Sequence, residues 1–108
     1  MDLAARLRAT LHGPAEAPAI DEAGRWWRWG ELRAVAEAID AALGPAPPGA
    51  PVVLLPRNRP AHVAALFGLL AAGRSVALVN PMQGAARIAE QLGQVGAIAV
   101  LADAEDAT

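Results

Sequence analysis

The segment PVVLLP, residues 51–56, is a short apolar run enclosed by two prolines. Two similar runs follow it, SVALVN at residues 75–80 and AIAVLA at residues 97–102. Apolar runs of this length, without alternating polar residues, are typical of strands buried on both faces, as in parallel sheets. The sequence therefore predicts three such strands in its second half.

Helical patterns fill the two intervals between these runs. The first begins with Pro60, a favoured residue at the first position of a helix, and ends at Gly73. The second covers residues 84–94. Strands that alternate with helices of about a dozen residues imply parallel pairing and right-handed crossovers. We therefore expect an α/β fold with three layers, in which a mainly parallel sheet is built as β-α-β-α-β over residues 51–102.

Three further elements are expected before the sheet. They are an amphipathic N-terminal helix over residues 3–11, a short β-hairpin rich in tryptophan around Gly24, and a helix over residues 30–43. In the hairpin, the period-2 geometry of a strand places Trp27 and Trp29 on one face and Trp26 on the other. We interpret the three tryptophans as packing residues; a platform on which a ligand stacks is the alternative.

The composition excludes several kinds of active site. The chain has 108 residues, enough for one domain, with 55% apolar residues and a formal net charge of −2. It contains no cysteine, no lysine and a single serine, so it has no thiolate nucleophile, no Schiff-base lysine and no P-loop lysine. Its arginines stand among acidic residues rather than in a basic patch, and we therefore expect no nucleic-acid partner.

The sequence shows no targeting signal and no membrane span. Its longest apolar stretch, residues 61–73, is shorter than the ~20 residues that a spanning helix needs. We therefore expect a cytoplasmic protein. A bias toward Ala, Arg, Gly and Pro, without lysine, indicates a GC-rich bacterial genome.

One glycine motif, Gly68 to Ser75, differs by one residue from a phosphate-binding Walker A loop. Such a loop follows a strand and opens a helix, whereas these glycines lie within and at the end of a helix that precedes a strand. We interpret Gly68 as a close-packing residue and Gly73 as the end of the helix. The two histidines, His12 and His62, lie on different helices without a carboxylate at metal-ligand spacing. We expect no metal site, and a structural, partly exposed His62.

The candidates for a ligand site follow the carboxyl ends of the first two strands, where open α/β sheets bind ligands. Arg57 and Asn58 follow the first strand, and Asn80 follows the second. The guanidinium of Arg57 is suited to pair with an anionic group. In the alternative interpretation, Asn58 or Arg59 caps the next helix, and Asn80 forms a turn with Pro81. We predict no catalytic residue in this chain.

Five segments, read in order, carry a resemblance to a known family. They are PAI at residues 18–20, RWWRWGEL at residues 25–32, PVVLLPRNRP at residues 51–60, AALFGLLAAG at residues 64–73 and VNP at residues 79–81. Their order and spacing resemble the start of the adenylate-forming (AMP-binding) superfamily, most closely the acyl-CoA synthetases and fatty-acid–CoA ligases. Two positions depart from the family: Arg28 stands where Thr or Ser is common, and Ala50 stands where Asp is frequent.

The resemblance implies a reaction. Members of the family activate a carboxylate with ATP to an acyl-adenylate and release pyrophosphate, and most then transfer the acyl group to a thiol such as coenzyme A. ATP, Mg²⁺ and coenzyme A are therefore implied for a full-length member. The family's Ser/Thr/Gly-rich phosphate loop and catalytic lysine are absent from this chain. We expect residues 1–108 to form a single partial domain with a loose tail at 103–108, without a cofactor of its own and inactive alone.

Three hypotheses for the function follow. The first is an N-terminal fragment of an AMP-forming acyl-CoA ligase, whose partner is the remainder of the synthetase or a second copy of itself. A dimer is expected because three parallel strands leave two open edges. The second hypothesis is a non-catalytic interaction or oligomerisation module derived from the same fold. The third is a small independent nucleotide-binding α/β domain.

Overall fold

The computed structural model describes residues 2–45 and 50–103. Its elements follow one another in the order α1 (Leu3–Leu11), β1 (Pro18–Glu22), β2 (Arg25–Arg28), α2 (Trp29–Leu43), β3 (Pro51–Leu54), α3 (Pro60–Ala71), β4 (Ser75–Leu78), α4 (Ala85–Val95) and β5 (Ala99–Leu101). This order confirms the predicted α/β fold. Residues 46–49 of the connector before β3 and residues 104–108 of the predicted loose tail lie outside the described residues.

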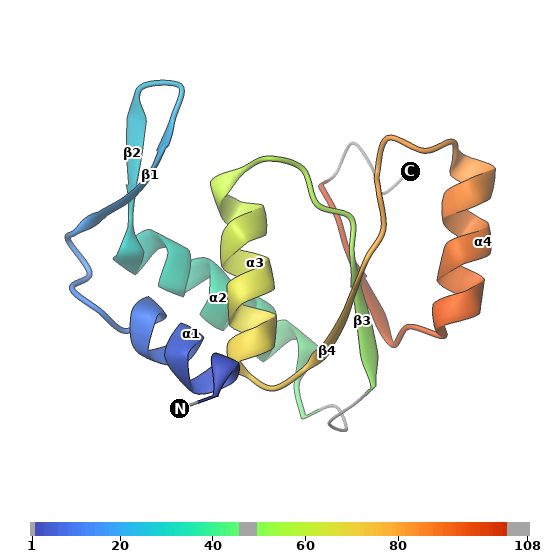
Figure 1. Ribbon diagram of the computed structural model, residues 1–108, viewed down its shortest axis with the longest axis horizontal. Helices are drawn as coiled ribbons and strands as arrows, with labels where there is room; N and C mark the ends of the chain where they lie inside the picture. Colours follow the sequence, from blue (N-terminus) through green and yellow to red (C-terminus); the bar gives the residue numbers. More distant parts are fainter. Residues whose placement is uncertain (1, 46–49, 104–108) are drawn as a thin grey trace.

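Strand β3 is the central strand of a three-stranded parallel sheet with the order β4-β3-β5. Val52 pairs with Val76 of β4 on one side and with Ala99 of β5 on the other. Helix α4 covers one face of the sheet, and α3 lies on the other face with α1 and α2 packed against it (Figure 1). The result is the predicted three-layer arrangement.

The core of the sheet surrounds β3. Val52, Val53 and Leu54 expose 0%, 0% and 2% of their surface, so this strand is buried on both faces as predicted. On the α4 side, Val53 belongs to a cluster that also contains Leu55, Val79, Ile88, Leu92 and Val95. At roughly 1.5–3 kcal/mol for each fully buried aliphatic side chain, this strand is the main apolar contributor to the sheet.

The two outer strands differ from the prediction. Burial on both faces is wrong for β4 and β5, because Leu78 exposes 57% of its surface and Val100 exposes 46%. Among the described strands, each outer strand pairs with β3 on one side only. The helices cover the centre of the sheet better than its margins, and the apolar pattern of the runs does not distinguish a central strand from an edge strand.

A second cluster joins the three N-terminal helices. Its buried centre consists of Leu11 of α1, Ala36 of α2 and Ala71 of α3, with Leu7, Trp29 and Phe67 packed against them. The prediction that Trp29 shares a hairpin face with Trp27 is wrong, since Trp29 is the first residue of α2. Arg28 ends β2 and is the N-cap of α2, so the chain turns into the helix one residue earlier than the pattern indicated.

The hairpin formed by β1 and β2 projects from the rest of the molecule (Figure 1). Its strands pair antiparallel, with Asp21 opposite Trp26. Between them, Ala23 and Gly24 have positive φ angles of 52° and 84°, as the two central residues of a type I′ turn do. Glycine adopts such angles readily, whereas alanine pays a steric penalty because of its Cβ.

Helix α3 has the predicted limits. It starts at Pro60 and ends with Ala72 as the C-cap, and Gly73 follows with a φ of +75°. This helix lies between the sheet and the other two helices, and apolar residues occupy nearly every one of its positions. Within residues 2–45 and 50–103, no helix is long and apolar enough to cross a membrane.

Candidate functional site

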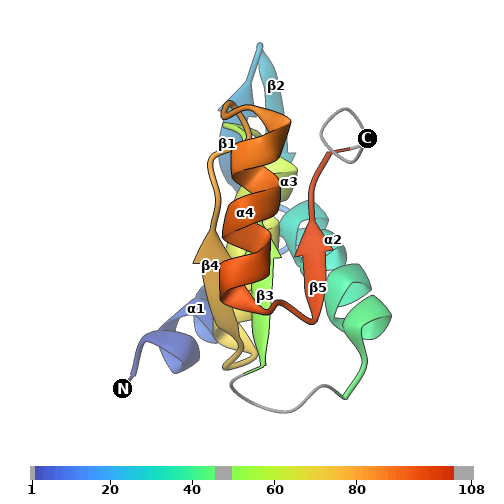
Figure 2. The ribbon, with the colours of Figure 1, turned by 90° about the vertical axis from the view of Figure 1, so that its right-hand side faces the viewer.

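The carboxyl ends of the three parallel strands meet at one edge of the sheet (Figure 2). Three segments leave the sheet there. They are the loop from β3 to α3 (55–59), the loop from β4 to α4 (79–84) and the segment that follows β5 (102–103). Ligands bind at this edge in open α/β sheets, so a ligand site is expected here.

The structure gives the three predicted site residues different surroundings. Arg57 is partly buried in the β3–α3 loop, and Asn58 beside it is exposed. Asn80 is exposed in the β4–α4 loop, where its Oδ1 accepts a hydrogen bond of 2.9 Å from the backbone N–H of Met82. Asn80 therefore forms a turn, as the alternative interpretation states. A ligand-facing role for Arg57, Asn58 and Asn80 stays a prediction.

The N-terminus of α3 is not capped by Asn58. Arg59 is the N-cap residue of the helix, and its side chain makes no capping hydrogen bond. Asn58 instead lines a small cavity of about 150 Å³ together with Asp21 and Glu22 of the hairpin and Val63 of α3. Of the two residues predicted to cap this helix, Arg59 is therefore the N-cap and Asn58 is not, because the helix begins at Pro60.

A polar cluster at this edge was not visible in the sequence pattern. His62 of α3 exposes only 8% of its surface, so the expectation of partial exposure is wrong. Its Nδ1 lies 2.6 Å from the backbone nitrogen of Arg57, and its Nε2 lies 2.8 Å from Oδ1 of Asp103. The Arg59 side chain pairs with the other carboxylate oxygen of Asp103. The first turn of α3 is thus joined to the end of β5.

No local spacing rule finds this cluster. His62 and Asp103 are 41 residues apart in sequence, and they meet because β5 runs parallel to β3. A search for a carboxylate close to His62 in sequence misses such a pair. The one signal in the sequence is that a histidine and an acidic residue each stand near the carboxyl end of a predicted parallel strand.

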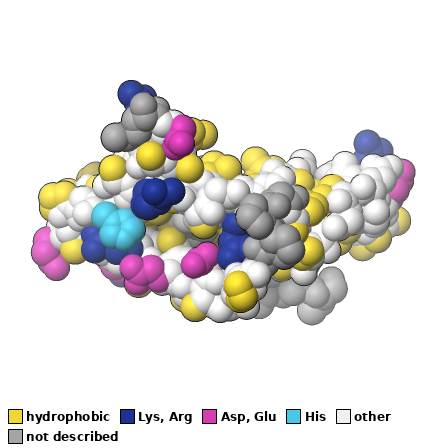
Figure 3. Space-filling view, turned by 90° about the horizontal axis from the view of Figure 1, so that it is seen from below, with side chains coloured by type: hydrophobic (Ala, Val, Ile, Leu, Met, Phe, Trp, Pro, Cys, Tyr) yellow, Lys and Arg dark blue, Asp and Glu magenta, His cyan; other side chains and the backbone are white. Residues whose placement is uncertain are grey.

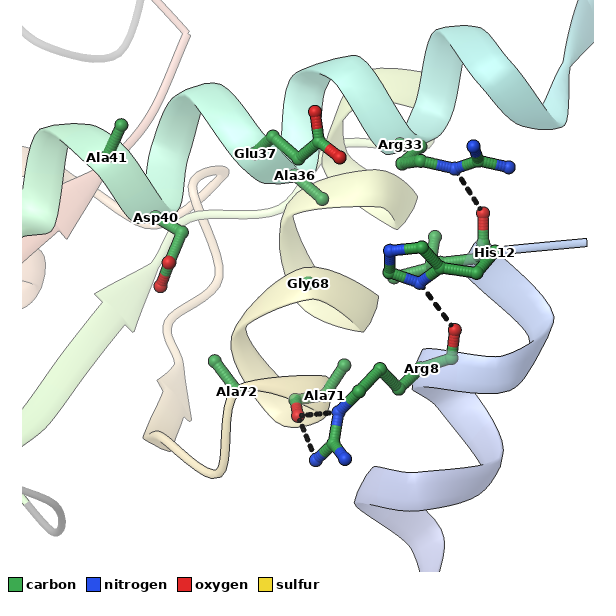
Figure 4. Close-up of a pocket in the computed structure, with 11 residues that line it drawn as sticks. Arg8, His12, Arg33, Ala36, Glu37, Asp40, Ala41, Gly68, Ala71 and Ala72 are labelled. Carbon is green, nitrogen blue, oxygen red and sulfur yellow. Dashed lines mark hydrogen bonds between the residues drawn. The ribbon is translucent and has the colours of Figure 1, made fainter. Parts of the chain in front are cut away.

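A groove away from this edge lies between α1, α2 and α3 (Figure 4). Its volume is about 350 Å³. Two arginines line it, and both bind backbone carbonyl oxygens at helix ends. Nη2 of Arg8 lies 2.9 Å from the oxygen of Ala71, and Arg33 donates to the oxygens of Leu11 and Gly13 at 2.8 and 2.7 Å. These cations satisfy helix carbonyls and fasten α1 to its neighbours.

Charges of both signs surround this groove. Glu37 and Asp40 of α2 line the same groove as the two arginines, and Asp40 pairs with Arg74 at 3.1 Å. From below, basic and acidic side chains are interspersed, without a continuous patch of one sign on this face (Figure 3). The arrangement favours helix packing over the binding of a polyanion.

The hairpin is joined to α2 through Glu31. One carboxylate oxygen of Glu31 accepts the backbone N–H of Arg28 at 3.1 Å, and the other pairs with Arg25 at 2.5 Å. The hydrogen bond from Arg28 and the neighbouring Arg25 guanidinium hold the pKa of Glu31 below its ordinary value. The guanidinium of Arg25 also lies 4.3 Å from the ring centroid of Trp27. The contact between the hairpin and α2 is therefore a structural junction made of charged groups.

The donors within residues 2–45 and 50–103 do not fit the phosphates and metal ion of an adenylation site. In the described part of the chain, no group of three or more His, Asp and Glu side chains is placed to hold a metal ion. The sequence supplies no lysine and only one hydroxyl in its sheet loops and strands, Ser75, which begins β4 at the opposite end from the candidate edge. The cofactors implied by the resemblance find no complete site here.

Three solved structures share this fold. IdnL1 is 28% identical, with a TM-score of 0.70 over 91% of this chain and 20% of its own. CmiS6 is 24% identical, with a TM-score of 0.76 over 99% of this chain and 28% of its own. PA1221, described as an NRPS protein containing adenylation and PCP domains, is 18% identical, with a TM-score of 0.68 over 91% of this chain and 20% of its own. No curated protein matches the chain.

The relatives are much longer than this chain, which spans 20–28% of the length of these three structures. At their level of identity, CmiS6 and PA1221 show the fold alone. The family assignment comes from the sequence, which matches the AMP-binding enzymes over residues 7–108. That range contains eight of the nine helices and strands in full and most of α1. The chain belongs to the AMP-binding enzyme family.

Proposed function

We propose that this chain is the first part of an adenylate-forming ligase, an enzyme that activates a carboxylate with ATP and passes the acyl group to a thiol. The observation that carries the proposal is the family match over residues 7–108. The fold supports it, since the parallel sheet and its helices are shared with IdnL1 over 91% of this chain. The same match disfavours an unrelated nucleotide-binding domain.

The chain's own contribution is a scaffold. It supplies a rigid parallel sheet and, at its carboxyl edge, the loops that hold Arg57, Asn58 and Asn80 for contact with a ligand. ATP, Mg²⁺ and coenzyme A are bound by residues outside this chain, because the donors described above do not form a phosphate or metal site. On this basis residues 1–108 alone do not activate a carboxylate.

Within this reaction class we favour a cytoplasmic, bacterial acyl-CoA synthetase acting on fatty acids, on the strength of the resembling segments. A carrier-protein thiol is the alternative acceptor, since the adenylation domain of PA1221 occurs together with a PCP domain. The two acceptors are distinguished by supplying either coenzyme A or a phosphopantetheinylated carrier protein to the same enzyme.

The test measures carboxylate-dependent exchange of labelled pyrophosphate into ATP, for residues 1–108 and for the product of the whole reading frame. We expect exchange with at least one carboxylate from a panel of fatty, aryl and amino acids for the whole product, and none for residues 1–108. Exchange by residues 1–108 would show that they hold a complete site. A whole product that exchanges with no member of the panel and binds no ATP would exclude the ligase.

An interaction module is the second candidate, and the exposed margins of the sheet favour it. Leu78 beside the open edge of β4 and Ile98 and Val100 at β5 expose 57%, 49% and 46% of their surfaces. Apolar side chains beside unpaired strand edges favour pairing with further chain. The remainder of the synthetase or a second copy of this chain would cover them. The interaction module is supported if residues 1–108 form a stable oligomer and the product of the whole reading frame shows no exchange of pyrophosphate into ATP.

A further inference from the structure

Both ring nitrogens of His62 are occupied. The backbone nitrogen of Arg57 lies 2.6 Å from Nδ1, and Oδ1 of Asp103 lies 2.8 Å from Nε2. The side chain is 9% exposed, so water has little access to either nitrogen. A buried imidazole with two such short contacts is held from both sides.

The chemistry of the partners defines the tautomer. A backbone N–H is only a donor, so Nδ1 of His62 must accept with its lone pair and carries no hydrogen. The hydrogen of the neutral ring is therefore on Nε2, which donates to the Asp103 carboxylate, an acceptor when ionised. In this arrangement both nitrogens of His62 are engaged within the protein, and neither faces a ligand.

We propose that His62 is a positioning residue, which as a neutral Nε2–H tautomer fixes the β3–α3 loop at Arg57 against the point where the chain leaves β5 at Asp103. Both joined segments lie at the carboxyl edge of the sheet. One follows the central strand and the other follows an outer strand, so the imidazole, beside the Arg59–Asp103 pair, joins two segments that leave the sheet. The proposal goes beyond the proposed function, since it holds whichever acid is activated.

Histidine is suited to this role because its two nitrogens are rigidly opposed. Asparagine places an acceptor oxygen near the position of Nδ1 but does not extend to that of Nε2. Glutamine extends to the position of Nε2, where its amide donates to Asp103, but it removes the acceptor that Nδ1 provides for the backbone N–H of Arg57. The two variants therefore separate the two halves of the bridge.

The primary test is the nitrogen NMR spectrum of the two histidine rings in the unmodified protein, which needs no variant. We expect His62 to show a protonated Nε2 and an unprotonated Nδ1. His12 is the internal control, because its Nδ1 lies 2.9 Å from the carbonyl oxygen of Arg8 and must donate there, which favours the opposite tautomer. A His62 ring with Nδ1–H, or one that averages between tautomers, overturns the proposal.

The second test is hydrogen exchange at the Arg57 amide. Loss of one hydrogen bond lowers its protection about fivefold to tenfold, so we expect this fall in His62→Gln and His62→Ala but less than about twofold in His62→Asn. In Asp103→Asn the Arg57 amide keeps its protection, while the segment after β5 exchanges faster. Equal losses of Arg57 amide protection in His62→Asn and His62→Gln would indicate a general loosening of the β3–α3 loop, and would reject the positioning role. Neither readout depends on adenylation, so the outcome is distinct from that of the proposed function.

Discussion

Gly68 of α3 lies against Ala36 of α2 so closely that a Cβ added to the glycine would stand 2.6 Å from the Cβ of the alanine. Real Cβ atoms do not approach to this distance, so the helices cross where one of them has no side chain. The close-packing role predicted for Gly68 is confirmed, and the segment lies in a helix that precedes a strand, not in a loop that opens a helix as a phosphate loop does.

Gly68→Ala is therefore expected to destabilise the protein. Overpacking of this kind costs about 1–3 kcal/mol, more than the ~1 kcal/mol that alanine gains over glycine as a helix former. The matched control is Gly93→Ala in α4, where an added Cβ meets nothing within 4 Å and stability should rise by up to ~1 kcal/mol. Urea unfolding of both variants measures the two changes, and a stabilised Gly68→Ala would contradict the close crossing.

Replacing Ala23 by asparagine should stabilise the hairpin. Ala23 has a φ of 52°, a region that costs an alanine roughly 1–2 kcal/mol and that asparagine tolerates better. The variant creates an Asn-Gly turn, which suits the type I′ geometry. We expect slower amide exchange in the hairpin by about fivefold, since ~1 kcal/mol corresponds to that factor. Gly24→Ala is the opposite control, and hairpin exchange must become faster in it because Gly24 has a φ of +84°.

Arg33→Ala is expected to loosen α1. Arg33 donates to the carbonyl oxygens of Leu11 and Gly13 at 2.8 and 2.7 Å, and hydrogen bonds from a charged group contribute about 1.5–3 kcal/mol each to an otherwise unsatisfied partner. Solvent reaches part of this site, so we expect a net loss of about 2 kcal/mol. The control is Arg6→Ala, because the exposed Arg6 side chain makes no hydrogen bond to the described residues. Equal unfolding midpoints for both variants would show that the hydrogen bonds of Arg33 do not stabilise the packing of α1.

The stability of the protein should depend on acid through Glu31. Because the folded-state pKa of Glu31 lies below the ordinary value of 4.5, its charge stabilises the fold above that pH, and this contribution is lost as the pH falls through the lowered pKa. Glu31→Gln keeps an acceptor oxygen for Arg28 but removes the charge.

The measurement is the unfolding midpoint in urea from about pH 7 down to about pH 3. The midpoints of the unmodified protein and Glu31→Gln should differ most at neutral pH and converge in acid. Glu37→Gln is the control, as the exposed Glu37 makes no hydrogen bond or ion pair with residues 2–45 and 50–103. A Glu31→Gln difference that stays constant over this range would mean that the charge is not the source of stability.

Residues 1–108 should self-associate through the margins of the sheet, and Leu78→Lys should reduce this association. Leu78 exposes 57% of its surface at the end of an edge strand, where a charge discourages strand pairing. Leu3→Lys removes an even more exposed side chain, 63%, from α1 and should leave association unchanged. Size-exclusion chromatography with light scattering distinguishes the outcomes. A clean monomer of the unmodified chain at high concentration would contradict this prediction.

The hydrophobic pattern, together with the prolines and glycines at the ends of elements, predicted the fold well. The run at residues 51–56 is the central strand, Pro60 begins α3, and Gly73 follows its end. These features are local, since a proline or glycine restricts its own backbone. The sequence also placed the candidate loops at one edge, because the topology of parallel strands determines where their carboxyl ends lie.

Features that depend on distant contacts escaped the prediction. The burial of His62 requires knowing that Asp103 arrives beside it from the end of another strand. The exposure of Leu78 and Val100 requires the order of the strands, which an apolar run does not reveal. Trp29 begins α2 and packs against the cluster of Leu11, Ala36 and Ala71, a tertiary arrangement that the alternation of the hairpin does not reveal.

The position of β3 between β4 and β5 has a consequence for synthesis on the ribosome. Both neighbours of β3 come later in the chain, so the nascent polypeptide carries this apolar strand without backbone partners until β4 and then β5 emerge. At roughly 5–20 residues per second the second neighbour follows several seconds after the first residues of β3. During that interval the helices α1, α2 and α3 can already associate. The emerging strand β3 is then the segment most prone to aggregate with other chains.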